Sequence, residues 1–166
     1  EFYWQTEDDV NGVLAKAYLN LLSTDAIKKA IVWGELRSET LTIPTNPNSE
    51  IKYVVEANLF DDNGYCNWAI YYEAIQTANL VIDRAQDVLE RDPDFTQGDC
   101  DVVIGEMYAL RALAHFYLVR AFRDIPMALE VVDKNYNMPQ YSQVHPLVAL
   151  NHIMADLDKA QGLVMK

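Results

Sequence analysis

The sequence predicts an all-α fold, a stack of antiparallel helical hairpins joined by long irregular loops. Apolar residues recur in steps of three and four along several separate stretches, as they do on one face of an α-helix. A short polar link separates the two longest stretches, which places those helices side by side and antiparallel. The alternation of apolar and polar residues that is typical of strands is nearly absent.

The first predicted helix spans about residues 7–22. Thr6 can cap it, and three acidic residues follow in the first turn, where the helix dipole favours negative charge. Its apolar stripe consists of Val10, Leu14, Ala17 and Leu21. Residues 25–31 then predict a short helix that ends near Gly34.

A long polar excursion follows from residue 37 to residue 65. Proline, asparagine and serine gather at positions 44–49, and an Asn-Gly turn stands at 63–64. Residues 51–55 are too few to assign to an element. A loop of this length in a compact domain usually carries function or covers another part of the chain. It is the first place to look for a binding site.

Two long helices come next. The first is predicted to have Asn67 as its cap and to end before Pro93, because proline cannot continue the backbone hydrogen bonds. Steps of three and four alternate along its apolar series, as at the seam between packed helices. That series is Trp68, Tyr71, Ile75, Ala78, Ile82, Ala85 and Leu89. The second helix is predicted to have Asp99 or Asp101 as its cap.

This second long helix is the central element of the predicted stack, and it ends at residues 124–126, Asp-Ile-Pro. A second apolar row widens its face: Leu113, Phe116 and Val119. We therefore expect other helices to cover it on more than one side. Arg111 lies within the apolar stretch, and we expect a buried ion pair with Glu106 or Glu73, since a buried arginine must be paired.

A second irregular connection, residues 127–141, leads to the last predicted helix. Ser142 is expected to cap this helix, and Pro146 lies near its first turn, where a missing amide hydrogen does little harm. Its apolar residues are Leu147, Leu150, Met154, Leu157 and Val164. Alanines along the long helices allow the close approach seen in tetratricopeptide-like stacks, although no strict repeat of about 34 residues can be laid over the chain.

Length and charge limit the possible functions. The 166 residues form one α-helical domain, 1–166, long enough to bury a core without disulfides. The net charge of −12 repels phosphate backbones and anionic lipid heads, which excludes nucleic acid and membrane-surface partners. No apolar run approaches the roughly 20 residues of a membrane span. Cys66 and Cys100 are expected to be free thiols.

The sequence nominates no catalytic, metal or cofactor site. His115, His145 and His152 lack the spacing of metal ligands, and residues 61–64 form an acidic turn that lacks the alternating acids of a calcium loop. No nucleophile elbow, P-loop or dinucleotide glycine pattern occurs. We therefore predict that the protein is not an enzyme.

Several segments taken together resemble the N-terminal half of the SusD/RagB family. They are residues 68–79, Gly105-Glu106, 111–119, the 124–126 exit, the start at 2–7 and the close at 145–160. The chain departs from the family at one point. The family usually has Gly-Asp before the hydrophobic-Pro exit, whereas Arg123 precedes Asp124 here, so a positive φ is not implied at this turn.

The resemblance implies a surface-exposed lipoprotein of the bacterial outer membrane. Such proteins capture glycans, or sometimes peptides, for a SusC-like TonB-dependent transporter. Family members are much longer and carry a lipidated cysteine near the mature start, which has no counterpart near Glu1. The chain is thus expected to be the N-terminal part of a longer SusD-like protein, whose membrane contact is made only through a lipid anchor that this chain lacks.

Sugar recognition needs flat aromatic faces and planar polar groups, and the long loop offers both. The nominated ligand-binding residues are Arg37, Glu39, Tyr53, Tyr65, Asn67 and Trp68. For Trp68 the competing interpretation is a core position, because it begins the regular apolar series. For the whole chain the alternative function is a structural helical scaffold that binds another protein and holds no small ligand.

Overall fold

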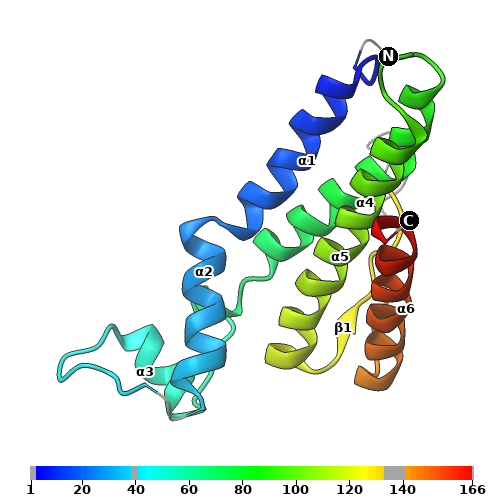
Figure 1. The fold of residues 1–166 in the computed structure, drawn as a ribbon. Helices are drawn as coiled ribbons and strands as arrows, with labels where there is room; N and C mark the ends of the chain where they lie inside the picture. Colours follow the sequence, from blue (N-terminus) through cyan, green and yellow to red (C-terminus); the bar gives the residue numbers. More distant parts are fainter. Residues whose placement is uncertain (1–2, 39–40, 133–140, 166) are drawn as a thin grey trace.

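The computed structural model describes residues 3–38, 41–132 and 141–165, and it confirms the predicted all-α, tetratricopeptide-like stack (Figure 1). The α-helices are α1 (Glu7–Leu21), α2 (Thr24–Ile31), α3 (Ser49–Val55), α4 (Ala69–Leu89), α5 (Gln97–Phe122) and α6 (Pro146–Val164). A π-helix (Val32–Leu36) extends α2, and a 3₁₀ turn (Gly64–Cys66) precedes α4. Within the described residues, β1 (Ile125–Pro126) pairs antiparallel with β2 (Gln143–Val144).

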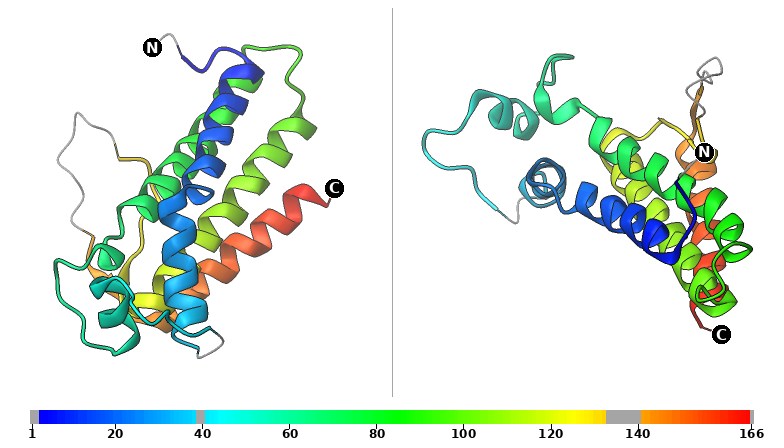
Figure 2. Two further views of the ribbon diagram at one scale, coloured as in Figure 1. Left: turned by 90° about the vertical axis from the view of Figure 1, so that its left-hand side faces the viewer. Right: turned by 90° about the horizontal axis from the view of Figure 1, so that it is seen from above.

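The helices form antiparallel neighbours around α5. Helix α4 packs along one side of α5, α6 packs along another, and α1 lies against both α4 and α5 (Figures 1 and 2). Helix α2 continues from α1 toward the opposite end of the bundle, where α3 projects outward. The same end holds the start of α4 and the end of α5. We call it the loop end.

The predicted caps of α5 and α6 need correction. Helix α5 is capped by Thr96, not by Asp99 or Asp101. Thr96 Oγ1 accepts the Asp99 amide N–H at 3.2 Å, while the Asp99 carboxylate accepts the Thr96 amide N–H at 3.3 Å. This reciprocal pair is a capping box, in which the acid belongs at the third helical position. Helix α6 is capped by His145 instead of Ser142, because residues 143–144 are held in the β-pair.

The first helix agrees with its prediction, and the Thr6 cap is confirmed as a second capping box, with Asp9. Asn67 is not the N-cap of α4, because Trp68 holds that backbone position. The Asn67 side chain still accepts the Ala69 amide N–H at 2.8 Å, so it satisfies one of the free donors of the first turn. The two thiols are free as expected, Cys66 half-buried and Cys100 buried.

Helix α5 is covered by α1, α4 and α6, which confirms that it is buried on more than one side. Its second apolar row is only partly buried, however. Val119 is buried, whereas Leu113 and Phe116 are 45% and 41% exposed. By length and mean hydropathy alone α5 could cross a membrane, contrary to the sequence expectation. In the bundle, 56% of its most apolar stretch of 18 residues is buried, as in the core helix of a folded domain.

Arg111 forms the predicted buried ion pair, but with a different partner. Its Nε and Nη2 donate to the two carboxylate oxygens of Asp156 on α6, each at 2.7 Å. Its Nη1 donates to Asn79 Oδ1 of α4 at 2.7 Å and to the Leu129 carbonyl at 3.1 Å. The planar fork of the guanidinium suits a carboxylate, which it binds through two parallel hydrogen bonds. The expected partners, Glu106 and Glu73, bond elsewhere or lie exposed.

The exit from α5 contains a strained turn. Arg123 has φ 67° and ψ −79°, and the amide N–H of Asp124 donates to the Phe122 carbonyl at 2.9 Å. A hydrogen bond across a single residue with positive φ defines a γ-turn, which is rare and costly for a residue with a side chain. The turn therefore takes a positive φ even though arginine stands where the family usually has glycine.

The segment around Gly34 continues further than expected. The short helix continues as a π-helix to Leu36 instead of ending near Gly34. The guanidinium of Arg120 lies against the backbone at Gly34, where a Cβ would make this side chain shift. The unassigned residues 51–55 are helical within α3, where Asn48 Oδ1 accepts the Glu50 amide N–H at 2.8 Å.

Candidate functional site: the loop end and the helix groove

The loop end is organised by Trp33 of the π-helix. Its indole N–H donates to the Tyr65 carbonyl at 2.8 Å, joining the two ends of the long loop. Its ring packs edge-on against Phe122, with 5.0 Å between centroids, and the Arg37 guanidinium lies 5.3 Å from the ring centroid. Arg37 is exposed at one end of this arrangement. A cation stacked on tryptophan is attracted by the ring quadrupole.

Trp68 belongs to the same aromatic cluster, but it packs against the core. Its ring centroid lies 5.1 Å from that of Phe122 and 6.2 Å from that of Tyr72. The Tyr72 hydroxyl donates to the Pro126 carbonyl at 2.7 Å. Trp68 is half-buried and packs against a buried apolar cluster to which α4, α5 and α6 contribute. These contacts favour the packing interpretation of Trp68 over a free sugar-stacking face.

Tyr65 lies between acidic groups. Burial raises the pKa of its hydroxyl, and the negative charges of Glu50 and Asp25 raise it further, so the group stays a neutral donor. The Glu50 carboxylate accepts the Gly64 amide N–H at 3.2 Å, and the Asn63 side chain donates to the Glu50 carbonyl at 3.0 Å. These bonds tie α3 to the 3₁₀ turn. Residues 61–64 thus form a turn stabilised by Glu50.

Of the other nominated residues, Tyr53 is half-buried and Asn67 is exposed. The rings of Tyr53 and Phe60 pack edge-to-face, with 5.2 Å between centroids, and Phe60 is 49% exposed. Asn67 is exposed, although its oxygen is used by the Ala69 amide. Glu39 lies outside the described residues. The structure thus brings Arg37, Tyr65 and Trp68 around Trp33 and Phe122, with Tyr53 in a separate ring pair.

Three aromatic residues of this end were missed by sequence reasoning: Trp33, Phe60 and Phe122. Trp33 lies near the predicted end of the short helix, and its role depends on a hydrogen bond to a residue 32 positions away. Phe122 closes the predicted central helix and gave no sign of a partner in the loop. Trp33 precedes the long polar loop in the sequence and Trp68 follows it, and this placement was the available signal.

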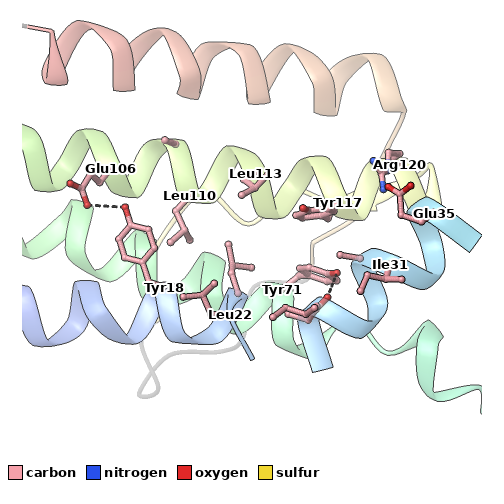
Figure 3. Close-up of a pocket in the computed structure, with 15 residues that line it drawn as sticks. Tyr18, Leu22, Ile31, Glu35, Tyr71, Glu106, Leu110, Leu113, Tyr117 and Arg120 are labelled. Atoms are coloured by element: carbon pink, nitrogen blue, oxygen red, sulfur yellow. Dashed lines mark hydrogen bonds between the residues drawn. The ribbon is translucent and has the colours of Figure 1, made fainter. Parts of the chain in front are cut away.

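A hollow runs along α5, opposite α2 and the end of α1 (Figure 3). We call it the helix groove. Its volume is about 620 Å³, within the range of small-molecule pockets. The lining is Tyr18, Leu21, Leu22, Ala26, Ile27, Ala30, Ile31, Glu35, Tyr71, Glu106, Ala109, Leu110, Leu113, Tyr117 and Arg120. No sequence signal pointed to it, because its walls are ordinary apolar helix faces.

The polar groups of the helix groove stand at its two ends. At one end the Tyr18 hydroxyl donates to the Glu106 carboxylate at 2.8 Å, and burial together with this contact raises the Tyr18 pKa to about 12. At the other end lie Glu35 and Arg120 (Figure 3). Tyr71 and Tyr117 stack along the wall with 5.8 Å between centroids. The groove therefore offers an apolar floor with charges at both ends.

Within residues 3–38, 41–132 and 141–165, no group of three or more His, Cys, Asp or Glu side chains is placed to hold a metal ion. His115 is fully buried, and its Nδ1 lies 3.1 Å from the Arg111 carbonyl. Burial, followed by the positive charge of Arg111, lowers the His115 pKa to about 4. The imidazole is therefore neutral at pH 7 and serves packing.

The architecture places the chain among the tetratricopeptide-like helical stacks, with its long loops gathered at one end. The family model described as starch-binding, associating with the outer membrane, matches residues 5–166. The chain belongs to this SusD-like family, which confirms the resemblance seen in the sequence.

The similar proteins agree with this assignment. The SusD-like protein P38 of Formosa agariphila is 29% identical over 134 residues, which cover 76% of this chain and 24% of that protein. The crystal structure of a SusD superfamily protein from Bacteroides thetaiotaomicron has a TM-score of 0.82 at 24% identity, covering 98% of this chain and 36% of its own. A laminarin-binding SusD-like protein has a TM-score of 0.74 at 20% identity, covering 95% and 34%. The chain thus spans about a quarter to a third of these relatives.

Proposed function

We propose that this chain is the N-terminal helical part of a longer SusD-like protein that captures glycans at the outer surface of a bacterial cell. The match of the family model over residues 5–166 is the observation that carries the proposal. One structural neighbour is described as laminarin-binding, which supports a glycan over a peptide ligand. The captured ligand passes to a SusC-like TonB-dependent transporter. The protein acts by binding and not by catalysis.

The loop end supplies the chemistry that this proposal needs. Arg37 and Asn67 offer planar polar groups for hydroxyls, and Tyr53 offers an aromatic face beside Phe60 for the apolar side of a pyranose. We propose these residues, with Glu39 and Tyr65, as this chain's share of the ligand site, and we assign Trp68 to the packing of the loop end. Trp33 positions the set, because it holds Arg37 and the Tyr65 backbone together.

Isothermal titration of the full-length protein against a panel of oligosaccharides and peptides tests the proposal. We expect binding to at least one oligosaccharide, with a loss of about tenfold in affinity for Tyr53→Ala and for Arg37→Ala, which is about 1.4 kcal/mol. Arg84→Ala is the matched control, because Arg84 is an exposed arginine on α4 that pairs with acids of its own helix. No binding to any member of the panel would refute the proposal.

The scaffold alternative is favoured by one observation, the largely apolar lining of the helix groove. Apolar grooves between helices commonly hold a partner helix. A pull-down with the SusC-like transporter distinguishes glycan capture from the scaffold function. Capture of the transporter by a protein that shows no affinity for any glycan or peptide would favour the scaffold. Loss of transporter capture with Ile31→Asp, which places a charge in the groove, would locate the contact there.

Membrane attachment is also a proposal. The family is described as associating with the outer membrane, and we propose a surface-exposed position held by a lipid anchor outside this chain. The excess of 25 acidic over 13 basic residues argues against direct contact with anionic lipid heads. Surface labelling of intact cells by an impermeant reagent, compared with labelling of lysed cells, checks this placement.

A further inference from the structure

The middle of the helix groove is aliphatic and open to solvent. Leucine, isoleucine and alanine side chains of α1, α2 and α5 form most of its lining. Leu22, Ile27 and Ile31 on one wall are 64%, 45% and 43% exposed, and Leu113 on the opposite wall is 45% exposed. Apolar side chains gathered at one hollow are costly to leave in water, and an apolar occupant recovers that free energy. The groove therefore has the character of a binding site.

One end of the groove carries a cation that is held in place but not neutralised. The Arg120 guanidinium lies against the backbone at Gly34. Its Cζ is 5.7 Å from the centroid of the Tyr117 ring and 5.9 Å from that of the Phe116 ring. Glu35 lies at the same end (Figure 3), but the two form no ion pair in the part of the chain that the structure describes. The ring contacts hold the guanidinium, and its planar fork of donors stays open to an anion.

The size of the groove limits its occupant. Glu106 and Arg120 mark its two ends and are separated on α5 by about 21 Å, at 1.5 Å per residue. The volume between the walls is about 620 Å³. A partner helix of that length, about 10–12 Å across, occupies about three times this volume and would stand mostly outside the groove. The volume instead suits a slender small molecule.

The distribution of polar groups determines the chemistry of that molecule. A glycan needs hydrogen-bonding groups along its whole length, whereas this groove has them at its ends. At the far end the Glu106 carboxylate already accepts the Tyr18 hydroxyl at 2.8 Å, so an anion is repelled there. The aliphatic part from Arg120 to Leu110 is about 15 Å long. An alkyl chain of about 12 carbons has this length, since C–C bonds of about 1.5 Å advance it by about 1.25 Å per CH₂.

We propose that the helix groove binds a fatty acid, with its carboxylate on the Arg120 guanidinium and its alkyl chain along the aliphatic walls. A guanidinium and a carboxylate form two parallel charge-assisted hydrogen bonds, which fixes the orientation of the chain. None of the described residues nominated for the glycan lines this groove. The fatty-acid site is therefore separate from the loop end, and the two ligands bind independently.

Isothermal titration of the full-length protein with dodecanoate, below its micelle concentration, tests the inference. We expect saturable binding of one molecule per chain, and about tenfold weaker binding for Arg120→Gln. Arg84→Gln, at an exposed arginine of α4, is the matched control and should change nothing. Methyl dodecanoate lacks the charge and should bind about tenfold more weakly. Octanoate, which is four CH₂ groups shorter, should bind about a hundredfold more weakly.

Substitutions in the walls locate the site. Ile27→Asp places a negative charge in the groove and should weaken dodecanoate binding at least as much as Arg120→Gln does. Leu19→Asp is its control, because Leu19 is an exposed residue of α1 outside the lining. Glu35→Gln removes a negative charge from the carboxylate end and should tighten binding by about two- to fivefold.

Four results would overturn the inference. Equal affinity for dodecanoate and its methyl ester would show that Arg120 does not bind the carboxylate. No saturable binding to the full-length protein would show that the groove holds no alkyl chain. Binding that survives both Arg120→Gln and Ile27→Asp would place the fatty acid elsewhere. Loss of dodecanoate binding in Arg37→Ala would place it at the loop end. None of these titrations contains a glycan, so their outcome is independent of glycan capture.

Discussion

The interface of α4, α5 and α6 and the loop end are built in different ways. The interface holds a buried ion pair and small residues on regular helices, and its central contacts join Arg111 to Asn79 and Asp156. The loop end holds half-buried rings on short elements, and a Trp33 hydrogen bond links the two ends of its long loop. The interface therefore fixes the frame of the domain, while the loop end depends on a few separate contacts.

Removing one partner of the buried pair should produce the largest effect. Asp156→Ala leaves the Arg111 guanidinium buried without its carboxylate, which costs about 3–5 kcal/mol of unfolding free energy. Urea denaturation of the 166-residue chain measures the loss. The double variant Arg111→Met, Asp156→Leu removes both charges and should recover most of the stability. A cost below about 1 kcal/mol for Asp156→Ala would show that the frame does not depend on this pair.

Acid should weaken the same interface through His115. Its pKa is lowered from 6.5 to about 4 by burial and by Arg111, so the folded state binds fewer protons than the unfolded state between these values. Stability is therefore complete above pH 6.5, falls as the pH drops toward 4, and loses about 3 kcal/mol from this group. Denaturation across this range should show a flatter profile for His115→Gln than for the wild type.

A pair of glycine substitutions measures how closely α5 and α6 pack. A Cβ at Gly105 would lie 2.6 Å from Val164 Cγ2 and 3.2 Å from Leu163 Cβ, so Gly105→Ala should cost about 1–3 kcal/mol. A Cβ at Gly162 on α6 would meet no atom within 4 Å, and Gly162→Ala should stabilise the helix by up to about 1 kcal/mol. Thermal unfolding compares the two. If the two substitutions changed the thermal stability equally, the end of α6 would have moved to make room for the methyl group at position 105.

The contrast between the helix interface and the loop end also explains what the sequence could predict. Periodicity located the long helices, because each helix repeats its signal over many turns. It found that Arg111 must be paired but not that Asp156 is the partner, since an ion pair between helices leaves no local pattern. It also identified the apolar row of α6, but not that this row is exposed, because periodicity identifies a face and not what covers it. The Trp33 contacts could not be predicted, as they join residues far apart in the chain.

The smallest expected effect is local to the loop end. Trp33→Phe keeps an aromatic ring against Phe122 but removes the 2.8 Å hydrogen bond to the Tyr65 carbonyl. We expect a loss of about 1 kcal/mol, the usual net value of such a bond. Hydrogen exchange should become faster at residues 63–67 and stay unchanged in α4 and α5, because local opening need not involve the core.

Trp4→Phe provides the control for this loss, since Trp4 packs against Tyr3 and its carbonyl accepts from Arg91, beyond the far end of α4. It should leave exchange at residues 63–67 unchanged. If Trp33→Phe instead accelerated exchange throughout α5, the contact between Trp33 and Phe122 would couple the loop to the frame. The loop end would then be part of the same cooperative unit as the Arg111 interface, and ligand contacts made there would stabilise the whole domain.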